Sequence, residues 1–405
     1  MLGDGLQGTL LAIRADLEGF STTVTGLIMS TFYIGFLLGS ILTPKLTQQV
    51  GHIRVFAALS ALASAAILLH ALFIEVPVWV ALRLLSGFCF AGLYIVAESW
   101  LNDRATNETR GKLLSLYMIV TYAGVGGGQL LLNLASPSEF PLFILTSVLI
   151  SVAVVPLLLS AGSPPKYQES VNISLLAVYR LSPLGIVSMF SVGLVTAAFF
   201  ALGPVYGQRM GLNVEYISYF MTAAVVGTVI LQAPIGALSD RFDRRIVLTI
   251  TTLLTSVAAV LCVFASQIST NLLLLAVAIF GGLALPLYSV CIAYTNDHLN
   301  PNQMIAASGA LVLTSGLGAV VGPILIASFM DHFGEQAMFW VIAAIHALTG
   351  LFALYRMTVS RAVPLDKQGP YTSTAVHPSG SAIESVQQYN RAEAIDDSTQ
   401  AKIQR

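Results

Sequence analysis

Charged residues are scarce in this chain of 405 residues: they make up only 10% of it, whereas 56% of the residues are hydrophobic. Soluble domains carry about 25% charged residues, so this chain lacks the side chains that would cover a water-facing surface. No stretch before residue 360 is polar and long enough for a soluble catalytic domain. The net charge of −1 also offers no basic surface to a nucleic acid. Composition therefore favours a protein embedded in a lipid bilayer.

Metal-binding, catalytic and nucleotide-binding patterns are lacking too. Cys89, Cys262 and Cys291 are the three cysteines, and they lie inside apolar runs without metal-ligand spacing, so we expect core residues and no metal site. No Gly-x-x-x-x-Gly-Lys-Ser/Thr loop occurs, which argues against ATP binding. No cluster of His, Asp, Glu or Cys suggests an enzyme, so we expect no catalytic residue and no cofactor. Asp4 comes too early for a cleavable signal peptide, and no basic segment precedes it.

Apolar stretches of about twenty residues, the length that a helix needs to cross a bilayer core, recur along the chain. We expect an all-α membrane protein. The segment from Met1 to Ile13 is apolar, but about thirteen helical residues rise only about 20 Å. We interpret it as the second half of a helix whose beginning is missing, which brings the expected total to twelve. The other eleven spans are predicted at 25–43, 55–74, 77–101, 113–134, 141–159, 184–208, 217–237, 246–265, 272–294, 306–329 and 337–355.

Lysine and arginine test this topology because they accumulate in cytoplasmic loops. With the N-terminus inside, Arg14 and Arg209 are the two basic residues at the outer side. We therefore expect a multi-pass protein of the plasma (inner) membrane with both termini in the cytoplasm. The thirteen at the inner side are Lys45, Arg54, Arg104, Arg110, Lys112, Lys166, Arg180, Arg241, Arg244, Arg245, Arg356, Arg361 and Lys367.

The chain divides into two halves and a tail. Residues 161–183 contain Pro and Ser and are predicted to link a six-helix half at 1–160 to another at 184–355. From Arg356 to Arg405 the sequence is polar and lacks apolar periodicity. Such a segment buries too little surface to offset the entropy lost on ordering, so we predict that residues 356–405 are disordered.

The loop from Gly236 to Arg245 resembles the signature loop of the major facilitator superfamily: a glycine, small residues, Asp-Arg, and a basic pair. The corresponding loop of the first half, Pro44 to Arg54, is degenerate, because Gln48 stands where the family has aspartate. In the fourth span, Arg83 and Gly87 resemble the Arg-x-x-x-Gly element of proton-coupled members. Resemblance covers nearly the whole chain up to about Tyr355.

Spacing between these motifs indicates an internal duplication. Gly236 follows Pro44 by 236 − 44 = 192 residues. Asn296-Asp297 follows Asn102-Asp103 by 296 − 102 = 194, and Gly318 and Gly322 follow Gly124 and Gly128 by the same 194. In the family, two such halves enclose a substrate site near the bilayer midplane.

The resemblance implies a secondary carrier that moves a small molecule by alternating access, coupled to protons. Because the expected cavity has little charge, export as a proton antiporter is favoured over uptake of a sugar or organic acid. A membrane sensor that kept the carrier fold without transport is the alternative from another class. We expect a monomer in the lipid bilayer whose partners are its small-molecule substrate and protons.

Ionisable groups within spans are costly and usually functional. Arg83 needs a partner, and we predict that it lines the cavity and pairs with Asp4, the alternative being that its side chain reaches the outer surface. Protonation of Asp4 would release the pair, which suggests a coupling site. For Glu98 the favoured interpretation is contact with cytoplasmic water and basic neighbours. His70 and His346 are interpreted as packing residues.

The remaining candidates are polar, aromatic or part of the signature loop. In the family that loop is a cytoplasmic latch, so we assign the latch to Gly236, Asp240, Arg241, Arg244 and Arg245. An alternative is that these charges only set the topology. Substrate-cavity candidates, some of which would otherwise belong to interfacial aromatic belts, are Gln7, Tyr33, Tyr117, Tyr122, Gln129, Phe200, Tyr206, Gln232 and Tyr288.

Overall fold

The computed structural model describes residues 1–104, 109–159, 174–360 and 362–373. Within these ranges all regular secondary structure is helical, and eleven spans are long and apolar enough to cross a membrane. The expected all-α membrane fold is therefore confirmed. The helices are α1 (Leu2–Leu17), α2 (Thr22–Val50), α3 (His52–Leu72), α4 (Val76–Arg104), α5 (Arg110–Leu130), α6 (Pro141–Val152), α7 (Val155–Leu158), α8 (Leu175–Leu181), α9 (Pro183–Arg209), α10 (Val214–Arg241), α11 (Arg244–Ile268), α12 (Thr270–Ala284), α13 (Leu287–Asn296), α14 (Pro301–Phe333) and α15 (Ala337–Val359).

Several boundaries differ from the sequence-based expectation. The first helix continues beyond Ile13 to Leu17. Two predicted spans are interrupted: α6 and α7 share the span at 141–158, and α12 and α13 share the one at 270–296, where Pro286 precedes α13. Part of the predicted linker is helical as α8, whereas 160–173 lies outside the described residues.

The start of the predicted disordered tail is also ordered. Helix α15 extends to Val359, and residues 365–367 form a short 3₁₀ helix. Gly369 and Tyr371 then hydrogen-bond to the second half of the chain. Backbone hydrogen bonds and the burial of one ring, that of Tyr371, hold this segment. A single ring does not make an apolar run, so hydropathy did not reveal it. Residues 374–405 lie outside the described part.

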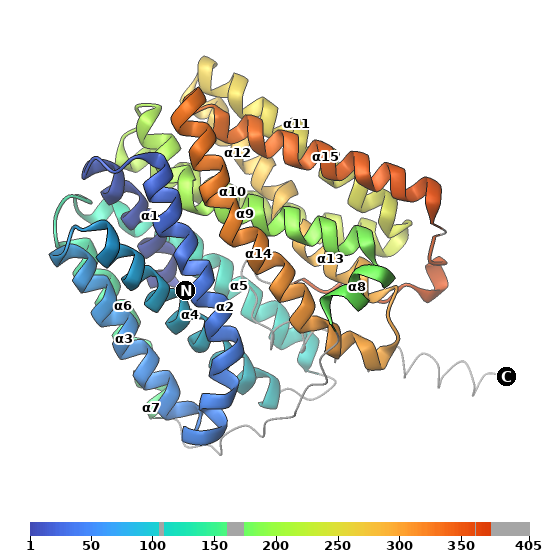
Figure 1. Cartoon of the computed structure of the whole chain (residues 1–405), viewed down its shortest axis with the longest axis horizontal. Coiled ribbons are helices and arrows are strands. Elements are labelled where there is room, and N and C mark those ends of the chain that lie inside the picture. Colours follow the sequence, from blue (N-terminus) through green and yellow to red (C-terminus); the bar gives the residue numbers. More distant parts are fainter. Residues whose placement is uncertain (105–108, 160–173, 361, 374–405) are drawn as a thin grey trace.

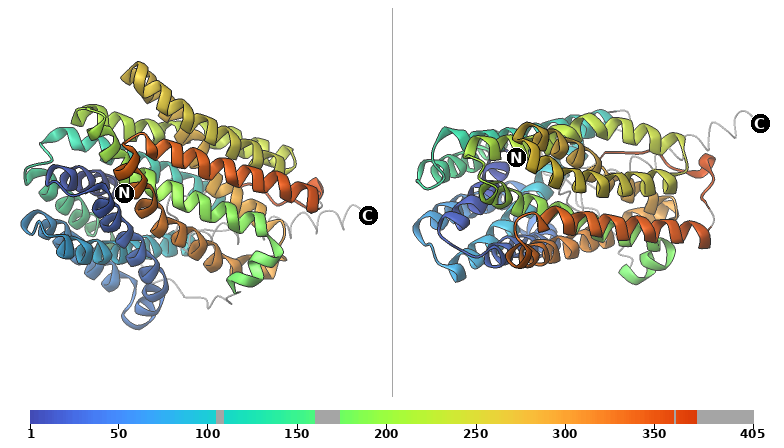
Figure 2. Two further views of the ribbon diagram at one scale, coloured as in Figure 1. Left: turned by 45° about the horizontal axis from the view of Figure 1, so that its top comes forward. Right: turned by 90° about the horizontal axis from the view of Figure 1, so that it is seen from above.

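The helices form two groups that pack along three seams. In Figure 1 the first half (α1–α7, blue to cyan) lies beside the second half (α9–α15, green to red), and both views of Figure 2 show the long helices side by side. Helix α2 packs against α14, α5 against α10, and α1 against α9. These six helices therefore form the boundary between the halves.

Helices α2 and α4 touch backbone to backbone through glycine. A side-chain carbon at Gly35 would meet the carbonyl oxygen of Leu84, and one at Gly87 would meet that of Phe32, both far inside van der Waals distance. Membrane helices approach this closely where small residues face one another. This contact fixes α4, and with it Arg83, against α2.

The second half repeats the contact residue for residue. Gly227 of α10 lies against the carbonyl oxygen of Ala278, and Gly281 of α12 lies against that of Ala224. The offsets, 227 − 35 = 192 and 281 − 87 = 194, are those that the loop motifs predict. Duplication thus extends from the sequence to the helix contacts.

A second pair of contacts repeats with the same spacing. Gly128 of α5 lies against the carbonyl oxygen of Leu2, and Gly322 of α14 lies in the same way against that of Leu194 of α9. The offsets are 322 − 128 = 194 for the glycines and 194 − 2 = 192 for the residues they contact. The predicted correspondence of Gly128 with Gly322 therefore agrees with the helix contacts.

Gly87→Ala tests the α2–α4 contact. Because the new methyl group meets backbone that cannot rotate away, we expect a loss of about 1–3 kcal/mol in unfolding free energy. Thermal unfolding of the purified protein in detergent measures it. Gly8→Ala is the matched control, since nothing lies within 4 Å of a side-chain carbon there. Equal stability of the two variants would contradict the contact.

Candidate functional site

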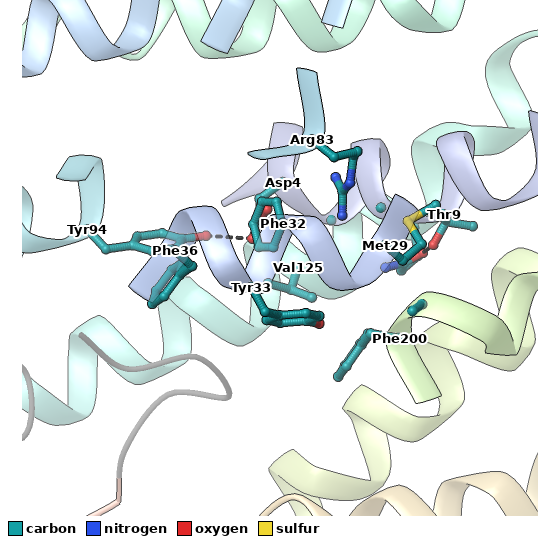
Figure 3. Close-up of a pocket in the computed structure, with 14 residues that line it drawn as sticks. Asp4, Thr9, Met29, Phe32, Tyr33, Phe36, Arg83, Tyr94, Val125 and Phe200 are labelled. Carbon is teal, nitrogen blue, oxygen red and sulfur yellow. Dashed lines mark hydrogen bonds between the residues drawn. The ribbon is translucent and has the colours of Figure 1, made fainter. Parts of the chain in front are cut away.

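A cavity lies where α1, α2, α4 and α5 of the first half meet α9 of the second half (Figure 3). Aromatic rings, one acid and one base line it, together with a hydrogen-bonded pair, Thr9 and Gln129. The cavity is therefore mostly apolar with a few convergent polar groups, as binding sites for small molecules usually are. Its lining residues are Asp4, Gly5, Gly8, Thr9, Met29, Phe32, Tyr33, Phe36, Arg83, Tyr94, Val125, Gln129, Phe200 and Ala201.

Asp4 and Arg83 both line this cavity, but each of them contacts a different residue. The hydroxyl of Tyr94 donates to Oδ2 of Asp4 over 2.6 Å (Figure 3). The guanidinium carbon of Arg83 lies 4.4 Å from the centre of the Phe32 ring, a cation–π contact. Among the described residues no ion pair joins Asp4 to Arg83, so a phenol and an aromatic face replace the predicted bridge.

Arg83 is buried, with 5% of its surface exposed, and its Nε has no hydrogen-bond partner among the described residues. The alternative interpretation, that it reaches the outer surface, is therefore excluded. The Phe32 ring and longer-range attraction to Asp4 stabilise its charge. A buried guanidinium in such surroundings retains capacity to bind an acceptor.

Glu98 is buried, with 4% of its surface exposed, and it accepts a hydrogen bond of 2.7 Å from the Tyr117 hydroxyl. The favoured interpretation was therefore wrong in placing Glu98 in cytoplasmic water, and its prediction of basic neighbours stays a prediction. Tyr94 lies one helical turn before Glu98 on α4. The two carboxyl groups each accept a hydrogen bond from a tyrosine hydroxyl, Asp4 from Tyr94 and Glu98 from Tyr117.

Three of the predicted substrate residues, Tyr33, Gln129 and Phe200, line the cavity. Tyr206 instead packs in the core, where its ring contacts Phe220 and Phe339. The predicted residues that lie outside the cavity lining are Gln7, Tyr117, Tyr122, Tyr206, Gln232 and Tyr288.

Sequence reasoning missed Tyr94, Phe32 and Phe36 in the lining. The spacing of Tyr94 and Glu98, one turn apart on the same helix, was the one signal available for Tyr94. The histidine predictions concern packing: His70 Nδ1 donates to the carbonyl oxygen of Ala66 over 2.7 Å and meets the Trp79 ring, and His346 is buried.

Charged groups join the two halves at the face where α1 and α9 end, which we call the Arg209 face. Arg209 Nε lies 3.0 Å from Oδ1 of Asp16, and its Nη1 lies 3.7 Å from Oδ1 of Asp331. The backbone N–H groups of Thr22 and Thr23 donate to Asp331 over 3.1 and 2.7 Å. A carboxylate of the second half thus caps a helix of the first half, where negative charge is favourable.

The predicted latch lies at the opposite end, which we call the Arg244 face. Arg244 is almost fully buried; its Nη1 lies 2.7 Å from both carboxylate oxygens of Asp297, and its Nη2 lies 3.2 Å from Asp240. Arg245 pairs with Asp243. Asp297 was missed as a latch residue, although its repeat partner had been noted. Among the described residues, these ion pairs stay within the second half.

The two faces therefore differ in how the halves are joined. One ion pair, Arg209–Asp16, and one helix cap, by Asp331, cross between the halves at the Arg209 face, whereas the described ion pairs of the Arg244 face do not cross. Duplicated membrane-spanning halves with a cavity between them are the architecture of a membrane transporter. The family model of the Major Facilitator Superfamily matches residues 1–228 and 211–382, and this chain belongs to that family.

Curated relatives agree with this assignment. The chain is similar to the "Uncharacterized MFS-type transporter YcaD" of Escherichia fergusonii, with 27% identity over 346 residues, 85% of this chain and 89% of the relative. The same protein of Escherichia coli O139:H28 gives the same values.

Among solved structures, the nucleoside transporter NupG matches with a TM-score of 0.71 and 14% identity, covering 87% of this chain and 96% of that one. A bacterial homologue of the human lysosomal transporter Spinster matches with a TM-score of 0.70 and 14% identity, covering 91% and 96%. At this identity the two structures establish the shared fold.

Asp331→Asn tests closure of the Arg209 face. Loss of the charge weakens both the α2 cap and the pairing with Arg209; a cap contributes about 0.5–2 kcal/mol, so we expect about tenfold more frequent opening. The probe is Met29→Cys in the cavity, labelled by a membrane-impermeant maleimide applied from the Arg209 face.

Two controls make the labelling result specific. Glu335→Gln removes an acidic charge near the same end of α14 and should leave the labelling rate unchanged. The protein without Met29→Cys reports any reaction of the buried Cys89, Cys262 and Cys291. Equal rates for Asp331→Asn and Glu335→Gln would show that the cap does not hold the face closed.

Proposed function

We propose that this chain is a proton-coupled secondary carrier that exports a small molecule from the cell by alternating access. The observation that carries the proposal is the cavity between the halves, where Asp4 and Arg83 lie without forming an ion pair. In this reading the halves rock about the cavity and expose it to one side at a time. Asp4 is the group that binds the proton.

The charges of the cavity support coupling. With Asp4 ionised, its negative charge offsets that of Arg83 in the same low-dielectric space. When Asp4 takes up a proton, the guanidinium loses this attraction. The net charge of the cavity then becomes more positive by one. Tyr94 holds the carboxylate in place through its hydrogen bond. Proton binding therefore changes how the site receives a substrate.

Distribution of basic residues supports the orientation. The Arg244 face carries most of the lysines and arginines and is assigned to the cytoplasm. The plasma membrane is the proposed location, with a monomer as the working unit. Because the Arg209–Asp16 ion pair and the Asp331 cap join the halves at the Arg209 face, we assign this conformation to the inward-facing state of the proposed cycle.

The lining supports a compact substrate with an apolar or aromatic body. Phe32, Phe36 and Phe200 offer ring faces, and Gln129 and Tyr33 offer hydrogen bonds. Export of such compounds is the first choice because one acid and one base alone carry charge in the lining. The name of the neighbour NupG makes nucleosides one class to test.

Uptake of an organic acid is a second candidate, favoured by one observation. Nε of Arg83 is buried without a hydrogen-bond partner among the described residues, and a substrate carboxylate would supply one. The third alternative, a sensor without transport, predicts binding in the absence of flux.

Purified protein in proteoliposomes separates these candidates. A panel of nucleosides, sugars, organic acids and amphipathic drugs is offered with and without an imposed pH gradient. Flux that follows the gradient supports the carrier, and its direction relative to the proton distinguishes antiport from symport. Measurable binding with no flux for any compound would favour the sensor.

Asp4→Asn tests the coupling site. Because the amide cannot bind a proton, we expect gradient-driven accumulation to fall to the level without a gradient, while exchange of internal for external substrate continues. Glu139→Gln is the control, since this carboxylate lies on the exposed loop before α6. Unchanged accumulation in Asp4→Asn would refute the assignment.

A further inference from the structure

The segment that follows α15 binds the latch through its backbone. Arg244 Nη2 donates to the carbonyl oxygen of Gly369 over 2.7 Å, and the N–H of Gly369 donates to Asp297 over 3.1 Å. The N–H of Tyr371 donates to Asp240 over 2.7 Å. Residues 369–371, which we call the tail segment, therefore occupy three charged latch residues at once.

The Tyr371 ring explains why position 236 is a glycine in this chain. A side-chain carbon at Gly236 would lie only 2.5 Å from this ring, so any larger residue would displace it. The phenol lies near Ser289 and Gln232 of the second half, and Gln232 also neighbours Tyr122 of α5. It therefore lies at the seam of α5 and α10, one of the three seams between the halves.

Burial has electrostatic consequences at this site. It raises the pKa of Tyr371 to about 12, so the phenol is neutral at physiological pH. Burial also raises the pKa of Asp297 to about 6, although Arg244 opposes that rise. The ring thus enters the seam without a charge, while the backbone of the tail segment supplies polar contacts to the latch carboxylates.

We propose that the tail segment is a clasp that holds the Arg244 face in its present conformation and must leave before that face can close. The inference rests on the proposed alternating access, in which α5 and α10 draw together at the Arg244 face as the Arg209 face opens. A ring held between them obstructs this movement, and the hydrogen bonds to Asp240, Arg244 and Asp297 tie up the latch.

Tyr371→Ala tests the clasp without any knowledge of the substrate. Spin labels at Leu72 and Ile268, exposed residues at the Arg209-face ends of α3 and α11, report the distance between the halves. We expect the population of molecules with the longer distance between the two labels to increase by at least about fivefold. This factor is the lower end of the range for coupled sites in proteins. Met29→Cys should react correspondingly faster from the Arg209 face.

Matched variants distinguish a clasp, which controls the conformation, from a strap, which only adds stability. Tyr371→Phe keeps the ring and should behave as the unmodified protein, because the hydroxyl lacks a well-formed hydrogen bond among the described residues. Tyr355→Ala removes an exposed tyrosine of α15 and should also change nothing. A strap predicts lower thermal stability of Tyr371→Ala with the distance distribution unchanged, and that result would overturn the proposal.

Failure of the clasp differs from failure of the proposed transport cycle. Asp331→Asn weakens the Arg209 face directly and serves as the positive control for opening. If this variant opens and Tyr371→Ala does not, the clasp is refuted and alternating access stands. If neither variant opens under any condition, the alternating-access cycle itself is refuted.

Discussion

Close backbone contact at glycines is the constraint on which the rest of the structure depends. In each half, glycines bring two pairs of helices together so closely that a single added carbon would collide with a carbonyl oxygen. Packing without flexible side chains between the backbones makes each half resist internal deformation. Close contact also occurs at the boundary between the halves, where Gly26 of α2 lies against the carbonyl oxygen of Pro323 of α14. The proposed alternating access needs halves that move as stiff bodies.

The same helix packing determines which residues Arg83 and Asp4 contact in the cavity. Because α4 is pressed against α2, Arg83 lies over a ring of α2 rather than beside a carboxylate. Asp4, on α1, meets Tyr94 of α4 instead. Opposite charges in one cavity that are kept apart by rings attract each other over a distance, which costs less rearrangement to reverse than breaking a buried salt bridge. Such an arrangement suits the proposed proton coupling, in which the charge of Asp4 changes.

Sequence reasoning reached the features that follow from local composition or repetition. Spans follow from the length of apolar runs, and Asp4 and Arg83 stand out because charge is rare within them. The pairing of Asp331 with the start of α2 could not be predicted, since a cap supplied by the other half leaves no pattern in either segment. The alignment of Gly128 with Gly322 also followed from repetition, and their contacts with Leu2 and Leu194 agree with it. The ordered structure of the tail segment was not predicted, because it depends on backbone hydrogen bonds, which a hydropathy pattern does not report.

The tail segment gives a physical reason to compare the two signature loops, because the first loop has Gln48 where the second has Asp240. In the second half, Asp240 accepts the N–H of Tyr371 and lies next to Arg244. Gln48, at the corresponding position of the first half, is neutral and offers no comparable acceptor for a buried cation. Among the described residues, the ion pairs of the Arg244 face lie in the second half, and the proposed clasp would act on that half and on the α5–α10 seam together. Because a conformational equilibrium shifts only through contacts that differ between its two states, the few interactions of Tyr371 at this seam are where a small free energy would have the largest effect.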